Sequence, residues 1–211
     1  MQDPMENKRF ITLEEARQVI NSFKTEAART EMLTDLAAYS EFVEDESSKI
    51  VLYEGDTTLP YLAVQHDIVI VNGNLTVNGI LEDALEVNLS LLMVEGNVTT
   101  QYLYTFSQID ISGDCIVEKA IVADSLRDCT LYVEGNLSAN LILEDGHWFN
   151  VQGTITANEI YTSHSAKPRG RLQRTLTDED LIDELKSKNR LDLSLAMHRF
   201  KNNELTVRNS K

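Results

Sequence analysis

The sequence predicts a mainly β protein, a right-handed parallel β-helix (a solenoid) of about six coils, with α-helices flanking it at both termini. The first observation behind this fold class is a recurring segment that reads apolar, any, apolar, any, glycine, and then Asn, Asp or Thr. The second is its spacing of 18, 23, 17, 22 and 18 residues. Repeats of about twenty residues with alternation inside each unit are typical of stacked solenoids. The six glycines are Gly55, Gly73, Gly96, Gly113, Gly135 and Gly153.

Residues 1–49 are predicted to form a helical cap. Thr12 and Glu15 have the spacing of a capping box at a helix start. Apolar residues then recur at helical spacing at Leu13, Ala16, Val19, Ile20 and Phe23. A second amphipathic segment carries Met32, Leu33, Leu36, Ala37 and Tyr39 on one side. Because the open end of a parallel β-stack exposes unpaired backbone groups, we expect helices at the termini to cover the ends.

Residues 50–163 are predicted to form the solenoid, with four columns of apolar residues pointing inward. The column four residues before the glycine is Val51, Val69, Leu92, Ile109, Leu131 and Phe149, and the column two before it is Tyr53, Val71, Val94, Ile111, Val133 and Val151. Two residues after the glycine stand Thr57, Leu75, Val98, Cys115, Leu137 and Ile155, and seven after it Leu62, Ile80, Leu103, Ala120, Ile142 and Ile160. The intervening column, mostly Thr, suits a water-exposed strand face.

Each glycine is interpreted as a sharp corner, because a residue without Cβ enters positive φ cheaply. The Asn or Asp that follows it tolerates or bridges such turns. Stacked coils rise about 4.8 Å each, so that six coils give a rod of about 29 Å. Coils near twenty residues without a six-residue period favour the right-handed winding.

One outward column is unusually apolar. It lies three residues before the glycine and consists of Leu52, Ile70, Met93, Asp110, Tyr132 and Asn150. A contiguous apolar strip on a strand face requires a cover, which is either a flanking helix or a partner. We favour the protein's own amino-terminal helices, since their apolar stripes need a surface.

Residues 164–211 are predicted to form a polar linker and carboxy-terminal helices. A helix is expected to start at residues 177–180 and to continue through Leu181, Ile182 and Leu185. A last amphipathic stretch runs from about Asp192 to Phe200.

The solenoid region is strongly acidic, with 2 Lys+Arg against 16 Asp+Glu in a chain of net charge -15. Such a surface repels phosphate backbones, which excludes nucleic acid as the expected partner. It attracts a basic protein and speeds the encounter with it. The alternative is that the acidity only keeps a β-rich rod soluble.

No apolar run reaches the length of a membrane span and no secretory segment is visible, so we expect a cytoplasmic protein without membrane contact. Cys115 and Cys129 are expected to be buried thiols rather than a disulfide. The sequence leaves a homo-oligomer open.

Signals for catalysis are poor, so that no enzyme, metal site or cofactor is predicted. The histidines and cysteines have no ligand spacing, and there is no phosphate-binding loop or nucleophile elbow. The most distinctive polar feature is a set of acidic residues that recurs nine to eleven residues after the glycines: Glu82, Asp83, Asp124, Glu144 and Asp145. Their roles are structure or solubility, a partner-binding edge, or catalysis or cation binding. Trp148 either anchors a partner or packs inside.

The segments VNGNLTV (71–77), VEGNV (94–98) and VEGNLSA (133–139) resemble the repeats of bacterial polymer-forming β-helix proteins of the bactofilin kind. They resemble still more a group of acidic bacterial solenoid proteins associated with polymorphic toxin systems. The second resemblance implies an immunity protein that binds and occludes a cognate, basic toxin domain or effector. In that role we expect the acidic corner residues to steer the partner and to pair with its Lys or Arg side chains, and Trp148 or neighbouring tyrosines to supply apolar anchoring. The corner residues are Glu82, Asp83, Asp124, Glu144 and Asp145. The first implies an end-to-end scaffold, against which the long flanking helices argue. A polysaccharide-active β-helix enzyme is the third alternative.

Overall fold

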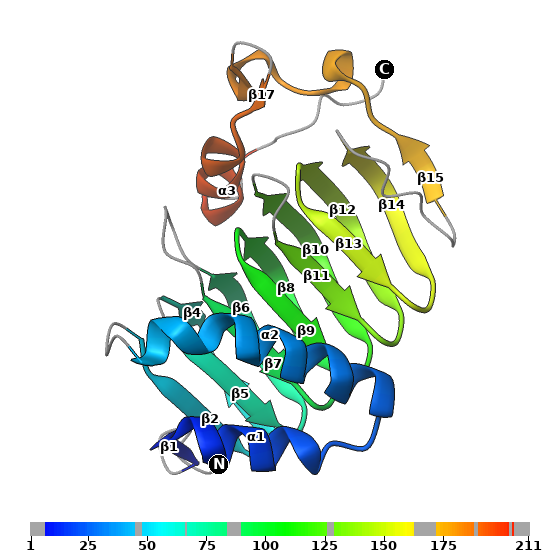
Figure 1. Ribbon diagram of the computed structural model, residues 1–211. Coiled ribbons are helices and arrows are strands. Elements are labelled where there is room, and N and C mark those ends of the chain that lie inside the picture. Colours follow the sequence, from blue (N-terminus) through cyan, green and yellow to red (C-terminus); the bar gives the residue numbers. More distant parts are fainter. Residues whose placement is uncertain are drawn as a thin grey trace.

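The computed structural model describes residues 7–44, 48–65, 67–83, 90–125, 129–162, 172–187, 190–202 and 204. It is a β-solenoid of six coils, as predicted, and each coil adds one strand to each of two sheets (Figure 1). Sheet A contains β2 (Ile50–Glu54), β5 (Ile68–Asn72), β7 (Leu91–Val94), β9 (Gln108–Ile111), β11 (Thr130–Val133) and β13 (Trp148–Val151) in this order. Sheet B contains β3 (Thr57–Leu59), β6 (Leu75–Asp83), β8 (Val98–Thr105), β10 (Cys115–Asp124), β12 (Leu137–Asp145) and β14 (Ile155–Thr162). A short strand, β4 (Leu62–Val64), also pairs with β6.

Successive coils pair in parallel throughout both sheets. In Figure 1 the strands of sheet A lie in front and run toward the lower right, whereas those of sheet B lie behind and run toward the upper left. Because the chain advances from lower left to upper right, the winding is right-handed.

The space between the sheets is filled by the predicted inward columns. The two columns before the glycine and the column two residues after it pack there, with Cys115 fully buried. The prediction that the column seven residues after the glycine points inward is wrong at two positions, because Ile80 and Ala120 pack on the outer face of sheet B. A register shift precedes each of them, between Val77 and Ile80 and between Val117 and Ala120. One extra residue in a strand reverses the face of every side chain that follows.

Glycine recurs at this corner for a different physical reason from the positive φ that we expected. Positive φ occurs only at Gly55 and Gly73 of the six, at 77° and 157°. From Gly73 onward, a Cβ atom would instead collide with the glycine backbone of the preceding coil. The glycines stack directly: the N–H of Gly113 donates to the carbonyl of Gly96 at 3.1 Å, and that of Gly135 to Gly113 at 3.1 Å. Close backbone approach therefore selects glycine at this corner.

The residue after each glycine forms a second ladder. Asn74 Oδ1 accepts from the backbone N–H of Asn97 at 2.8 Å, Asn97 Oδ1 from that of Asp114 at 2.8 Å, and Asp114 Oδ1 from that of Asn136 at 2.7 Å. Each side chain thus satisfies a backbone donor of the next coil, which explains the preference for Asn or Asp at this position.

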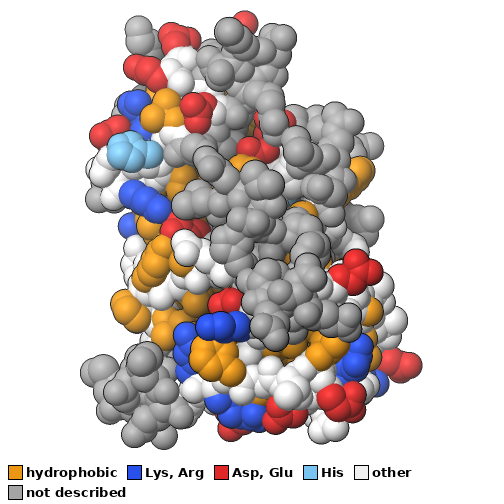
Figure 2. All heavy atoms as spheres, turned by 60° about the vertical axis from the view of Figure 1, so that its left-hand side comes forward, with side chains coloured by type: hydrophobic (Ala, Val, Ile, Leu, Met, Phe, Trp, Pro, Cys, Tyr) orange, Lys and Arg blue, Asp and Glu red, His pale blue; other side chains and the backbone are white. Residues whose placement is uncertain are grey.

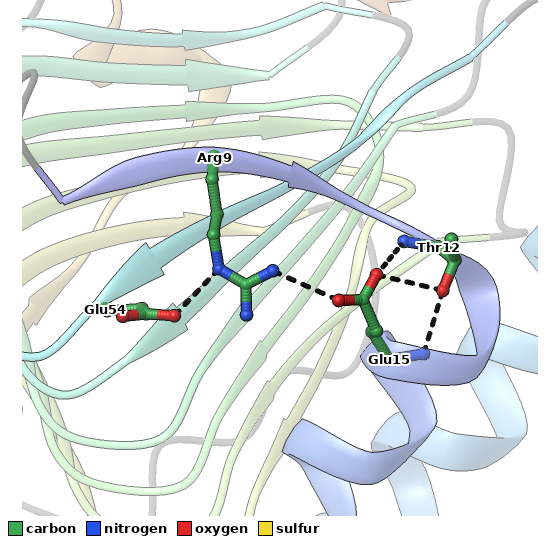
Figure 3. A network of polar contacts seen from close by, with 4 residues as sticks. All are labelled: Arg9, Thr12, Glu15 and Glu54. Carbon is green, nitrogen blue, oxygen red and sulfur yellow. Dashed lines mark hydrogen bonds and ion pairs between the residues drawn. The ribbon is translucent and has the colours of Figure 1, made fainter.

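The amino-terminal residues close one edge of sheet A and cover its outer face. Strand β1 (Lys8–Ile11) pairs antiparallel with β2, and α1 (Leu13–Asn21) follows it through the predicted capping box (Figure 3). Glu15 Oε2 accepts from the N–H of Thr12 at 2.8 Å, and this bond is the largest cause of the lowered pKa of Glu15. Arg9 bridges Glu15 at 3.3 Å and Glu54 at 2.8 Å, which ties the helix start to β2.

The apolar outward column is covered by the protein itself, as we favoured. Helices α1 and α2 (Glu26–Glu44) lie across sheet A in Figure 1. Their buried side chains, among them Ile20, Phe23, Met32 and Leu36, pack with the strand residues Leu52, Ile70 and Met93. The helices therefore cover the face of a sheet, and β1 rather than a helix closes the edge of β2.

The carboxy-terminal residues cover the outer face of sheet B. Strand β15 (Leu172–Thr175) pairs with β14, and it is followed by η1 (Asp178–Asp180), η2 (Asp183–Leu185), β16 (Lys186–Ser187), β17 (Arg190–Leu191) and α3 (Leu193–Lys201). Two 3-10 turns thus replace the α-helix expected from residue 177, although Asp180 does accept from the N–H of Thr177 at 2.8 Å. The last predicted helix is confirmed as α3. The predicted linker at residues 164–170 lies outside the described residues.

Candidate interaction surface

The acidic residues predicted as a partner-binding edge lie at the returns from sheet B to sheet A. Two of them cap backbone turns. Asp83 is 2 % exposed, and its Oδ1 accepts from the N–H groups of Phe106 at 2.5 Å and Ser107 at 3.1 Å in the next coil. Its Oδ2 accepts from the hydroxyl of Thr105 at 2.6 Å. Burial nevertheless dominates and raises the pKa of Asp83 to about 7.

Glu144 likewise caps a backbone turn, in the fifth coil. Its side chain is fully buried, and Oε1 accepts from the N–H groups of Gly146 at 2.5 Å and His147 at 3.1 Å. The hydroxyl of Thr162 in the following coil donates to Oε2. In this conformation the carboxylates of Asp83 and Glu144 satisfy backbone donors and are not presented to a partner.

Glu82 is also occupied within the chain. Its side chain is 7 % exposed and accepts from Lys201 Nζ of α3 at 2.8 Å and from the hydroxyl of Tyr61. The basic end of α3 therefore neutralises this acid. On the face drawn in Figure 2, the described acidic (red), basic (blue) and hydrophobic (orange) side chains are intermixed and do not form one acidic surface.

The remaining predicted residues are accessible. Asp124 and Asp145 are half-buried and stand opposite each other at the ends of β10 and β12, so the structure brings these two together. Glu82 and Asp83 are not beside them, because β8 lies between β6 and β10. Trp148 begins β13, and its side chain is 49 % exposed.

A second acidic surface, which the sequence reasoning missed, lies at the glycine corner. We call it the glycine-corner ridge and define it as the residues on either side of the glycines that carry carboxylates: Glu54, Asp56, Glu95, Asp114 and Glu134. All five are exposed or half-exposed. The signal was available, because these residues occupy fixed positions one before and one after the aligned glycines.

The ridge carboxylates are only partly used within the protein. Arg9 pairs with Glu54, and the hydroxyl of Tyr132 donates to Glu134. Asp56 and Asp114 accept backbone bonds through Oδ1. Within the described part of the chain, no lysine or arginine pairs with Glu95, Asp114 or Glu134. Among the described residues, therefore, the negative charge of Glu95, Asp114 and Glu134 has no basic partner, whereas that of Glu54 does.

His147 is a buried base at a return. The side chain is 1 % exposed, and burial lowers its pKa to about 4 although the nearby backbone of Asp124 favours the charged ring. Among the residues that the structure describes, neither ring nitrogen finds a hydrogen-bond partner of normal geometry. Phe149 packs against the ring edge at 6.2 Å between centroids.

Replacing His147 by leucine is expected to stabilise the fold. The substitution removes two unpartnered buried nitrogens, which should raise the free energy of unfolding by about 1–2 kcal/mol near neutral pH. Chemical denaturation of both proteins measures the difference. A loss of stability in His147→Leu would show that the imidazole makes a polar contact that matters.

Other kinds of site have no support in the described residues. They contain no group of three or more His, Cys, Asp or Glu side chains placed to hold a metal ion. Both cysteines are buried free thiols. No helix in the described ranges has the length and apolar character of a membrane span.

Comparison with known proteins finds no family model, no curated protein and no solved structure that matches the chain.

Proposed function

We propose that the chain is a protein-interaction module, and more specifically an immunity protein that binds and occludes a cognate basic toxin domain. The observation that carries the proposal is the glycine-corner ridge, in which Glu95, Asp114 and Glu134 have no lysine or arginine partner among the described residues, whereas Glu54 is paired with Arg9. Acids that maintain the fold, such as Asp83 and Glu144, are buried instead. An uncompensated acidic edge steers a basic partner and accelerates its association.

The repeat gives the ridge a regular geometry that suits a basic segment. Glu54, Glu95 and Glu134 occupy the same column in alternate coils, one, three and five. With about 4.8 Å between neighbouring strands, their spacing is about 10 Å. Two turns of an α-helix rise about 11 Å. A helix with Lys or Arg every two turns could therefore lie along the ridge.

Charge reversal on the ridge tests this mechanism. The first step is to read the neighbouring genes: a toxin reading frame there supplies the probe, and its absence would count against the immunity role. We expect the double variant Glu95→Lys/Glu134→Lys to slow association with this probe by about tenfold at low salt, with a smaller effect at high salt. The matched control is Glu41→Lys/Glu179→Lys, which changes net charge equally at two exposed positions away from the ridge. Rates come from stopped-flow mixing.

Two results would contradict the proposal. One is an association rate that does not depend on salt, and the other is an equal loss in the ridge variant and the control. Protection of cells that express the toxin tests the immunity role itself, and its absence would leave at most a binding module.

The end-to-end scaffold is disfavoured by β1. Its antiparallel pairing with β2 occupies the edge at which a parallel stack would add the next strand of sheet A. We therefore expect sedimentation of the purified protein to show a small, defined particle. Long filaments would reverse this preference.

A further inference from the structure

One carboxylate interrupts the apolar face on which α2 packs. Asp110 stands in the outward column between Met93 and Tyr132, and its side chain is fully buried. It faces Asp35 of α2, which is half-buried, and the two carboxyl groups lie within hydrogen-bonding reach of each other. Two acids thus meet at the contact between α2 and sheet A, where the neighbouring positions are apolar.

Gln108 holds the two acids together. Its Nε2 donates to Asp110 Oδ1 at 2.8 Å and to Asp35 Oδ2 at 3.0 Å, and its Oε1 accepts from the N–H of Thr130 at 2.9 Å. Asp110 Oδ2, by contrast, is buried and accepts no hydrogen bond from any described residue. A proton on this oxygen would convert it into a donor to Asp35, which satisfies the buried atom and removes one of two adjacent negative charges.

Among the described residues, the other titratable groups that act on this contact are Glu, Tyr and Cys side chains, all of which are acids. Glu31 of α2 acts on both carboxyl groups, and Tyr132 of β11 is influenced by Asp110. Tyr39 of α2 is hydrogen-bonded to Cys129 and is influenced by Asp35 and Asp83. None of the interactions on the pair comes from a described lysine or arginine. Among the described residues, therefore, no basic side chain compensates the second charge, and a shared proton would do so.

We propose that a single proton shared by Asp35 and Asp110 holds α2 on sheet A, and that its loss loosens α2 and uncovers the apolar residues Leu91 and Met93 of β7, the strand on which α2 packs. Burial, followed by the charge of Asp35, raises the pKa of Asp110 well above its usual value. For an acid with a raised folded-state pKa, the stabilisation is complete at low pH and is lost as pH rises through that pKa. The contact is thus an acid-stabilised latch that opens toward alkaline pH.

Hydrogen exchange of the α2 amides as a function of pH tests the latch. After correction for intrinsic exchange, protection of α2 in the wild-type protein should fall by about tenfold or more between acidic and alkaline pH, relative to the amides of β10 and β12. In Asp110→Asn the neutral side chain keeps the contact with Asp35, and α2 protection should not depend on pH. Asp35→Asn, which removes the other partner, should give the same result and serves if Asp110→Asn does not fold.

The matched control is Asp83→Asn, because Asp83 is likewise a buried acid with a raised pKa, about 7, but its hydrogen bonds go to the return that begins at Thr105. This variant should retain the wild-type pH response of α2. Equal pH responses in the wild-type protein and in both latch variants would overturn the proposal.

Discussion

Gly113→Ala should destabilise the protein by at least about 3 kcal/mol, because the new methyl group has no space in the stack. A Cβ atom at this position would lie 2.8 Å from both the carbonyl carbon and oxygen of Gly96, and it would also meet Oδ1 of Asn97. The Gly96 atoms belong to the backbone of a hydrogen-bonded ladder. They therefore cannot move aside by a rotamer change, as a side chain could. The glycine ladder and the Asn/Asp ladder would both be disturbed.

The matched control is Gly55→Ala at the first coil. Gly55 has φ 77° but nothing lies within 4 Å of its Cβ position. That substitution should cost only about 1–2 kcal/mol, the strain of a left-handed alanine. Urea denaturation followed by circular dichroism compares the two variants. A cost at Gly113 no larger than that at Gly55 would mean that backbone conformation, and not stacking, selects glycine at this corner.

The contrast between these two glycines illustrates what the sequence could predict. Alternation of apolar and polar residues reports which side of a strand is buried, and this was sufficient for the six coils and for the columns nearest the glycine. It does not report what a backbone atom meets in the neighbouring coil. The extra residues before Ile80 and Ala120 could not be predicted from the sequence for a related reason. A bulge changes the face of the sheet on which a side chain lies, but it does not change the residue type.

The candidate site, too, could be predicted only in part from the sequence. The recurrence of acids at the returns was visible, but their burial depends on what donates to them and on what covers them. Thr105 and the backbone of Phe106 enclose Asp83, and α2 encloses Asp110. These neighbours are remote in sequence, so composition alone made the returns seem an exposed acidic edge. The glycine-corner ridge was within reach, because its residues occupy fixed places in the repeat.

Asp83→Asn should make the protein more stable than the wild type above about pH 7, by as much as about 4 kcal/mol. The asparagine can reproduce the cap. Its Oδ1 accepts from the N–H groups of Phe106 and Ser107, and its Nδ2 can donate to the hydroxyl of Thr105, which already lies 3.1 Å from the carbonyl of Ser107 and can donate there. The substitution therefore removes a buried charge while it keeps the hydrogen bonds.

The sign follows from the raised pKa of Asp83. Its usual value is 3.8, and in the folded protein it is about 7. Between these values the folded protein holds a proton that the unfolded chain has lost, so the free energy of unfolding falls as pH rises from about 3.8 to about 7. His147 acts in the opposite direction: its pKa of about 4 in the fold, against 6.5 normally, means that stability falls as pH decreases from about 6.5 to about 4.

Between about pH 4 and about pH 6.5, the effects of Asp83 and His147 on the free energy of unfolding of the wild-type protein should therefore oppose each other. The single variants measure each effect by itself. The difference in unfolding free energy between Asp83→Asn and the wild type should grow with pH and level off above about pH 7. The difference between His147→Leu and the wild type should grow as pH falls below about 6.5. Denaturant titrations across this range measure both. A difference for Asp83→Asn that stays constant with pH would mean that Asp83 remains ionised in the fold, because its three hydrogen bonds then outweigh its burial.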